Sequence, residues 1–98
     1  MGQVRWTEQA AKDLDCIARY IAEDSPHHAS LFVIDLLEAV ERLRDFPKLG
    51  RMVPEVSDPR IREIILGNYR AVYRLKGNDV EILTVHHGAR LFDPSSIE

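Results

Sequence analysis

The chain has 98 residues and a formal net charge of −3, a length that fits one domain with a small core and a balance that argues against general attraction to nucleic acid. It contains no run of about 18 apolar residues that could span a membrane, and no export leader is recognisable at its start. The single cysteine, Cys16, excludes an internal disulfide, so we expect a protein of the reducing cytoplasm with no membrane partner.

Charge is distributed unevenly along the chain. Residues 1–47 contain five Lys or Arg and nine Asp or Glu, whereas residues 48–90 contain eight and five. An acidic half is therefore followed by a basic half. A phosphate-bearing or acidic partner would be attracted to the second half only.

The first quarter of the chain predicts a short strand followed by a helix. Val4 and Trp6 alternate with polar residues, which indicates a strand that pairs with a later sheet. Thr7 can cap a helix with its hydroxyl, and the apolar residues that follow recur at helical spacing over residues 8–23. Cys16 is expected to be a small, partly buried hydrophobe of this helix.

A second helix is predicted from Pro26 to about residue 45, antiparallel to the first, because Ser25 can cap it and Pro26 suits its first turn. Its predicted inner positions recur with the helical period: Ala29, Phe32, Val33, Leu36, Val40 and Leu43. Leu31, Ile34 and Leu37 add more apolar surface than one buried stripe needs. Either this helix is sandwiched between the first helix and the sheet, or part of that surface contacts a partner.

The second half of the chain predicts an antiparallel sheet. Pro47 and Gly50 end the second helix, and residues 52–59 then form a connecting loop. Beyond this loop, two Gly-Asn pairs at residues 67–68 and 77–78 separate three runs rich in β-branched and aromatic residues. This pattern predicts a three-stranded meander with two-residue turns.

The fold class is therefore α+β: a short N-terminal strand, an antiparallel helical hairpin and a three-stranded antiparallel meander, with the helices on one face of the sheet. We expect one domain over residues 1–98, with residues 91–98 as a flexible or partner-contacting tail. Alternation on the middle strand predicts one core face and one free, basic face. The core face comprises Tyr69, Ala71, Tyr73 and Leu75, and the basic face comprises Arg70, Val72, Arg74 and Lys76.

Four segments together resemble a known family. They are WTEQAAKDLDCIARYIAEDSP, FPKLGR, REIILGNYRAVYRL and ILTVHHGAR, and in this order they are similar to toxins of the RelE/ParE superfamily, from bacterial type II toxin–antitoxin pairs. The likeness covers about residues 4–90, and the last segment and the long helical hairpin resemble the ParE branch more than the RelE branch. That branch implies a toxin that blocks DNA gyrase, and thereby replication, instead of cleaving RNA. It also implies a cognate antitoxin whose extended C-terminal segment neutralises the toxin.

Arginines of the basic face are the candidate target-binding residues. Arg70 and Arg74 project from it and Arg90 follows the last strand, and guanidinium groups there could bind phosphate or carboxylate. The alternative is a solvated face with surface ion pairs. Nearby carboxylates are expected to pair with the arginines: Glu63, Asp79 and Glu81.

A ribosome-dependent mRNA endonuclease of the RelE type is the alternative function. By resemblance, Arg70 matches the strand arginine that these nucleases use at the scissile phosphate. Arg70 and Arg90 would then hold the phosphate charge while His86 or His87 moved protons. The arrangement that we favour for these histidines is without catalysis: one is a hydrogen-bonded residue at the strand end and the other is exposed. Nucleases of this branch cluster lysines at the active site, whereas this chain has three lysines in separate elements, so no catalytic residue is expected.

Partners follow from the resemblance and from the exposed residues. An antitoxin is expected to use the hydrophobic groove beside the helical hairpin and a sheet edge, in a toxin–antitoxin hetero-oligomer. Its predicted contacts are Leu31, Ile34, Leu37, Arg51, Arg60 and Arg62. DNA gyrase is the expected target, with the ribosome and mRNA in the alternative, and a non-toxic family member that only binds its antitoxin is the third possibility. We expect no cofactor and no metal, because adjacent strand histidines diverge and no third ligand lies nearby.

Overall fold

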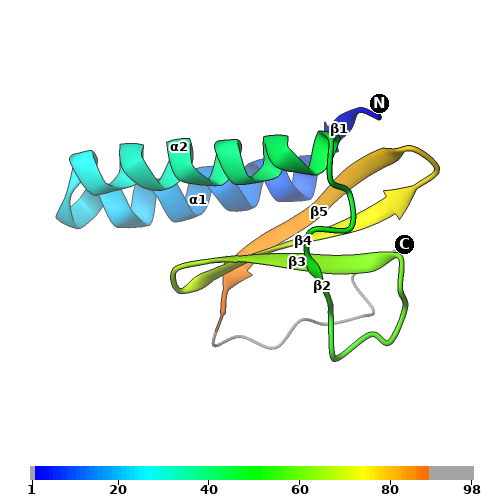
Figure 1. Ribbon diagram of the computed structural model, residues 1–98. Coiled ribbons are helices and arrows are strands. Elements are labelled where there is room, and N and C mark those ends of the chain that lie inside the picture. Colours follow the sequence, from blue (N-terminus) through cyan, green and yellow to red (C-terminus); the bar gives the residue numbers. More distant parts are fainter. Residues whose placement is uncertain (1, 89–98) are drawn as a thin grey trace.

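A five-stranded sheet and a helical hairpin make up residues 2–88, the part of the chain that the computed structural model describes (Figure 1). The elements are β1 (Val4–Trp6), α1 (Glu8–Asp24), α2 (Pro26–Glu41), the 3₁₀ helix η1 (Arg42–Arg44), β2 (Arg51–Met52), β3 (Ile61–Leu66), β4 (Tyr69–Lys76) and β5 (Asp79–His87). Both predicted helices are confirmed. The last turn of the second helix tightens into η1, which accounts for its predicted end near residue 45.

The sheet has the strand order β1-β5-β4-β3-β2. The meander of β3, β4 and β5 is antiparallel as predicted, and β1 joins it in parallel beside β5, as expected of the N-terminal strand. Strand β2 was missed, because Arg51 ends the segment that was predicted to stop the second helix and Met52 begins the predicted loop. The two residues pair only at the sheet edge. A strand so short carries no periodicity to detect.

Local signals set the element boundaries. The Thr7 hydroxyl accepts a hydrogen bond from the amide of Ala10 at 3.1 Å and donates one to the carbonyl of Ile82 at 2.8 Å, so it caps α1 and ties the cap to β5. Ser25 caps α2 by accepting from the amide of His28 at 3.2 Å. Gly67 and Gly77 have φ values of 58° and 62° at the two turns.

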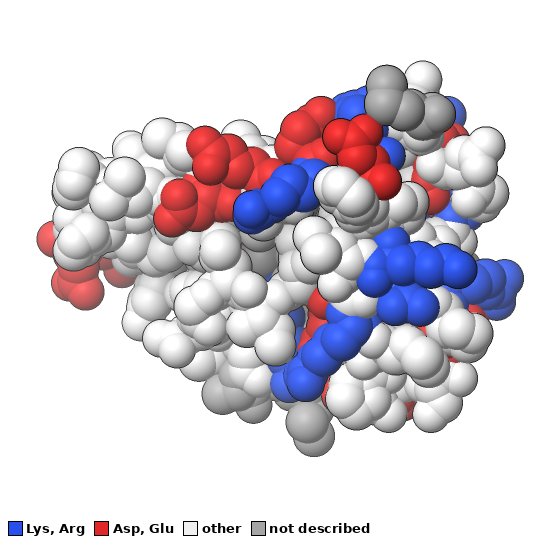
Figure 2. Space-filling view, in the orientation of Figure 1, with Lys and Arg blue, Asp and Glu red and all other residues white. Residues whose placement is uncertain are grey.

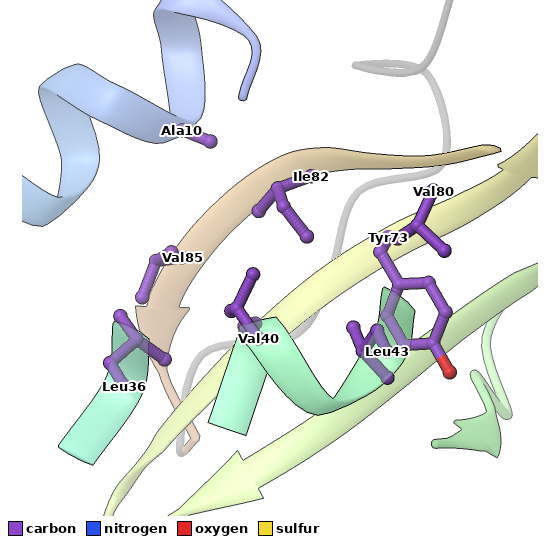
Figure 3. Close-up of a cluster of buried hydrophobic side chains, with 9 residues drawn as sticks. Ala10, Leu36, Val40, Leu43, Tyr73, Val80, Ile82 and Val85 are labelled. Carbon is purple, nitrogen blue, oxygen red and sulfur yellow. The ribbon is translucent and has the colours of Figure 1, made fainter. Parts of the chain in front are cut away.

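The main core lies between the helical hairpin and the sheet (Figure 3). Side chains of α2 and η1 meet side chains of β4 and β5 there, and Ala10 is the buried residue of α1. Of the predicted inner positions of the second helix, Ala29, Leu36, Val40 and Leu43 are buried. The prediction that the helices cover one face of the sheet is confirmed (Figure 1).

The opposite face of the sheet is not free at its centre, which corrects the predicted basic face. Val72 is fully buried there in a second cluster with Val53 and Ile61, and the loop after β2 covers it. Ala71 and Tyr73 belong to the main core and Val72 to this second cluster, so the predicted alternation of faces along β4 is confirmed. Residues 71–73 are all buried because both faces of the sheet are covered there.

A polar contact continues the edge of β5 beyond the end of β1. The carboxylate of Asp13 accepts hydrogen bonds from the hydroxyl of Thr84 and from the amide of Val85, the latter at 3.2 Å. A helix side chain thus satisfies strand groups that no strand covers. Cys16, on the same helix, is exposed, which corrects its predicted partial burial. It lies on the solvent side of α1. A small side chain such as cysteine occurs on either side of a helix, so residue type did not indicate its exposure.

Candidate functional site

A groove of about 350 Å³ lies between the end of α2 and strand β3. It is lined by Ala39 and Arg42, by residues 49–51 and by residues 63–66. Two exposed apolar side chains flank it, since Leu49 is 56% exposed and Ile65 also 56%. Figure 2 shows the surrounding charge: Lys and Arg gather over β2 and the adjoining loops, and Asp and Glu gather over the hairpin.

The edge of the sheet beside the groove is partly unpaired. Strand β2 pairs with β3 only at the partners Arg51↔Glu63 and Met52↔Arg62. Within residues 2–88, no strand covers the outer edge of residues 64–66. Because Leu66 and Tyr69 close a two-residue turn, they are expected to form a hydrogen-bonded pair, which turns the amide of Ile65 toward the open edge. That amide can accept a further strand.

The loop between η1 and β2 is held in place by Tyr73. The Tyr73 hydroxyl accepts a hydrogen bond from the amide of Gly50 at 2.9 Å and donates one to the carbonyl of Pro47 at 2.7 Å. Its ring is fully buried beside Leu43, with the hydroxyl pointing away from Ile82 (Figure 3). Burial raises the pKa of the Tyr73 hydroxyl above its usual range.

Residue 50 of this loop must be a glycine, because there is no space for a side chain at this position. A Cβ on Gly50 would lie 2.5 Å from the carbonyl oxygen of Glu63 and 2.7 Å from the Tyr73 hydroxyl. The loop is thus fixed from beneath while Phe46, 64% exposed, and Leu49 face solvent. From the sequence, the segment FPKLGR was predicted only to end the second helix and to be part of the family resemblance. The hydrogen bonds of Tyr73 to Pro47 and Gly50 fix the conformation of this segment.

Buried charge lies under the groove. The side chain of Glu63 is fully buried, and its carboxylate pairs with Arg51 at 2.6 Å and with Arg70 at 3.2 Å. Arg70 also contacts Glu55 at 3.3 Å, and its side chain is only 16% exposed. Two carboxylates therefore occupy the guanidinium that the sequence offered as a free phosphate ligand.

The remaining arginines of the sheet are also engaged. Arg74 pairs with Glu81, and Arg5 approaches Asp79 at 3.8 Å. The expected ion pairs of Glu63, Asp79 and Glu81 are therefore confirmed, and Arg70 and Arg74 do not form an open cationic face. Their role in target binding stays a prediction. Arg90, the third candidate, lies outside the described residues.

The predicted basic contacts of an antitoxin lie near one another around β2. Arg60 pairs with Asp58 at 3.0 Å, and this hydrogen bond holds the pKa of the Asp58 carboxyl below its usual range. Arg62 donates to the carbonyl of Gly50 at 3.0 Å, so it also supports the groove loop. Arg51 lines the groove itself. Of these three arginines, Arg51 and Arg62 thus lie at the groove or its loop, whereas Arg60 pairs within the loop that precedes β3.

The predicted apolar contacts form a second surface on α2, which we call the helix face. It consists of Leu31, Ile34 and Leu37, exposed by 44%, 51% and 45%, together with the exposed carboxylates Asp35 and Glu38. The inner positions of α2 point to the opposite side. Of the two expectations for this apolar excess, burial between the first helix and the sheet is therefore wrong for these three residues. Contact with a partner stays a prediction.

The histidines of β5 have separate environments. His86 is 8% exposed and its Nδ1 lies 2.9 Å from the carbonyl oxygen of His87. His87 is exposed and its ring packs edge-on against Tyr69 at 5.3 Å, which in turn packs against Phe32 at 5.0 Å. One histidine is thus hydrogen-bonded and buried while the other is exposed, which is one of the two expected arrangements. No pattern of residues indicated the aromatic stack.

Two nuclease candidates do come together in the sheet. Arg70 and His86 are direct partners across β4 and β5. They meet, however, as a paired guanidinium and a buried imidazole, which leaves little room for a phosphate between them. No group of three potential metal ligands occurs among the described residues. Nor does any helix of residues 2–88 combine the length and the apolar character that crossing a membrane requires.

The sequence as a whole matches a family model. Residues 4–92 fit the model described as ParE toxin of type II toxin-antitoxin system, parDE. The chain belongs to the ParE toxin family. This membership confirms the resemblance and the branch that the last segment indicated.

Individual relatives support this ParE assignment. The protein Y4kP of Sinorhizobium fredii is 39% identical over 87 residues, which cover 87% of this chain and 86% of that protein. Toxin ParE3 of Caulobacter vibrioides is 33% identical over 89 residues, covering 90% and 88%. A solved structure described as the chromosomal ParDE TA system from P. aeruginosa matches with a TM-score of 0.72 and 31% identity, over 89% of this chain and 96% of that one. The α+β fold of this chain is thus that of a ParE toxin.

Proposed function

We propose that this ParE-family chain is a toxin that inhibits DNA gyrase and blocks replication, and that a cognate antitoxin neutralises it. Family membership supports a toxin that works with an antitoxin. The observation that favours gyrase inhibition over RNA cleavage is the pairing of Arg70. A nuclease needs that guanidinium for the phosphate, and here Glu55 and Glu63 already hold it.

The test compares the two targets directly. Purified chain, freed of antitoxin, is added to gyrase with relaxed plasmid and, separately, to translating ribosomes with a defined mRNA. We expect loss of supercoiling with accumulation of cleaved DNA, and intact mRNA. Normal gyrase activity at excess toxin would overturn the proposal. Cleaved mRNA that becomes intact with Arg70→Ala would establish the nuclease.

The antitoxin segment is proposed to fill the groove and to add a strand to the open edge of β3. Three features support this mode. The edge at residues 64–66 lacks a strand partner within the described residues, apolar groups line the groove, and Arg42 and Arg51 border it. Main-chain hydrogen bonds would supply affinity, and carboxylates of the segment would meet the arginines. An acidic, apolar, extended segment fits best.

A matched pair of variants tests the strand addition. Ile65→Pro removes the amide proton that faces the open edge, whereas Ile65→Ala shortens the same side chain and keeps that proton. Antitoxin affinity should fall strongly for the proline variant and little for the alanine variant, as measured by calorimetry. Thermal unfolding of both variants checks that the pairing of β3 with β4 persists. Equal affinities of two folded variants would overturn the strand addition but leave gyrase inhibition standing.

A further inference from the structure

The loop between η1 and β2 exposes a turn at residues 46–49, which we call the loop tip. The carbonyl of Phe46 accepts a hydrogen bond from the amide of Leu49 at 3.0 Å, so the four residues form one turn. Pro47 occupies its second position and Lys48 its third. Phe46 and Leu49 are exposed by 64% and 56%, and Lys48 is exposed as well. The turn therefore presents an aromatic ring, an aliphatic side chain and an ammonium group to solvent.

The loop tip is held in place although it is exposed. The Tyr73 hydroxyl donates to the carbonyl of Pro47 at 2.7 Å and accepts from the amide of Gly50 at 2.9 Å. Arg62 donates to the carbonyl of Gly50 at 3.0 Å, and the proline ring fixes one backbone angle within the turn. The ring of Phe46 is thus carried on a fixed backbone. Little conformational entropy is lost when such a residue binds a ligand, which favours binding.

Positive charge surrounds the loop tip. Residues 42–52 contain four Lys or Arg and a single acidic residue. Two of these cations, Arg42 and Lys48, are exposed and form no ion pair within residues 2–88. A third, Arg51, pairs with Glu63 but keeps 53% of its side chain exposed. Lys and Arg gather over β2 and the adjoining loops, whereas Asp and Glu gather over the hairpin (Figure 2). An anionic ligand is therefore attracted to the loop tip and repelled by the hairpin.

The loop tip lies only partly within the groove. Leu49 lines the groove, whereas Phe46 and Lys48 are not among its lining residues. A strand added to β3 at residues 64–66 would therefore leave the ring and the ammonium group exposed. These two groups need a ligand of their own.

An exposed ring beside cations fits a nucleic-acid strand with unstacked bases. Aromatic side chains stack on the faces of such bases, while Lys and Arg contact the neighbouring phosphates. Phe, Leu and Pro also serve as wedges at opened base steps in protein–DNA complexes. An acidic protein surface would satisfy the cations but would leave the ring in water. Since the chain as a whole has a net charge of −3, the attraction is local.

We propose that the loop tip binds single-stranded DNA. The ring of Phe46 stacks on a base, and Lys48 and Arg42 contact the phosphates beside it, with Arg51 as a third cation. The turn carries no pair of groups arranged to read base edges, so the affinity is independent of sequence. The choice of DNA over RNA rests on the proposed function, because gyrase acts on DNA. The toxin would then contact the DNA that gyrase holds as well as the enzyme.

The experiment measures binding of the full chain to a labelled DNA strand of mixed sequence by fluorescence anisotropy. The comparison ligands are the same strand annealed to its complement and a polyglutamate peptide of equal charge. We expect the single strand to bind at least about tenfold more tightly than either, because only its bases can stack on the ring. Three phosphate contacts predict that log affinity falls with log salt concentration at a slope of about −2.

Three outcomes would overturn the proposal. They are no binding of the DNA strand, equal binding of the duplex or of polyglutamate, and tighter binding of an RNA strand of the same sequence. Neither gyrase nor antitoxin is present in this experiment. A negative result therefore leaves gyrase inhibition and strand addition standing.

Matched variants locate the contact. Phe46→Ala should weaken binding of the single strand by about tenfold, and Phe46→Trp should retain it. Tyr20→Ala is the control, since it removes a ring that is 70% exposed on α1, and it should bind as the parent chain does. Lys48→Ala should make the salt slope shallower by about 0.7, whereas Lys12→Ala removes the same charge from α1 and should leave the slope unchanged.

All four residues are exposed, and thermal unfolding checks that the variants stay folded. Unchanged binding by folded Phe46→Ala would refute the assignment. Loss of binding in either α1 control would refute it as well.

Discussion

The groove and the helix face both expose apolar side chains, but they are built in different ways. The groove rests on contacts between residues far apart in sequence, namely the Tyr73 hydroxyl under its loop and buried Glu63 under its floor. The helix face needs only the regularity of α2. A surface of the first kind can be damaged by residues that never touch a partner. A surface of the second kind depends on its own side chains alone.

The largest loss of folding stability among variants of the two surfaces is expected for Glu63→Ala. This change leaves Arg70 partly buried with only Glu55 as a partner, so it should destabilise the fold by about 3–5 kcal/mol. Urea unfolding measures the loss. Glu38→Ala on the helix face is the control and should change stability by no more than about 0.5 kcal/mol. Similar losses for both variants would contradict the distinction between the two surfaces.

The second largest loss of stability is expected for Gly50→Ala. Its Cβ would collide with the carbonyl of Glu63 and with Tyr73, so the loop must shift, at about 1–3 kcal/mol of stability. Antitoxin affinity should fall as well. A Cβ added to the turn residue Gly77 would meet no atom within 4 Å, but Gly77 has positive φ, so Gly77→Asn, which tolerates that φ, is a milder comparison.

Tyr73→Phe removes the hydroxyl and leaves the buried amide of Gly50 without its acceptor, which should cost about 1–2 kcal/mol. The pKa of Tyr73 is raised in the folded protein, so the neutral form is favoured by folding. Its contribution is complete below the ordinary tyrosine pKa of about 10 and is lost as pH rises through the folded value. Stability measured between pH 8 and pH 11 should therefore decline less steeply in Tyr73→Phe than in the parent chain.

The smallest effect on stability is expected on the helix face. Ile34→Asn replaces a half-exposed side chain and should shift the free energy of unfolding by no more than about 0.5 kcal/mol. Urea unfolding measures this change. A large loss of stability would mean that Ile34 belongs to the core.

Local signals in the sequence predicted the parts of the fold that depend on neighbours in the chain. Thr7, Ser25 and Pro26 marked the helix starts, and the Gly-Asn pairs marked both turns. These features act through hydrogen bonds and dihedral preferences a few residues apart. They therefore appear in the sequence itself.

Long-range contacts decided the rest. No pattern indicated that Tyr73 holds the loop at residues 47–50, or that Glu55 would join Glu63 in pairing with Arg70. The burial of Val72 depends on a loop folding over the second face of the sheet. The exposure of Cys16 could not be predicted for the same reason, because it depends on which side of α1 faces the sheet. The sequence thus predicted which residues form the candidate site. It did not predict that two carboxylates already pair with Arg70.

The pairing of β1 with β5 has a consequence for the synthesis of the protein. Strand β5 lies between β1 and β4, and its partner β1 is made first, with Val4 opposite Val80. During translation an inner strand of the sheet, β5, is therefore the last of these strands to leave the ribosome. A nascent chain can form its helical hairpin early, but Ala10, Leu36 and Val40 find their partners Val80, Ile82 and Val85 only near the end. A chain that stops before β5 therefore lacks the strand on which the buried side chains of its helical hairpin pack.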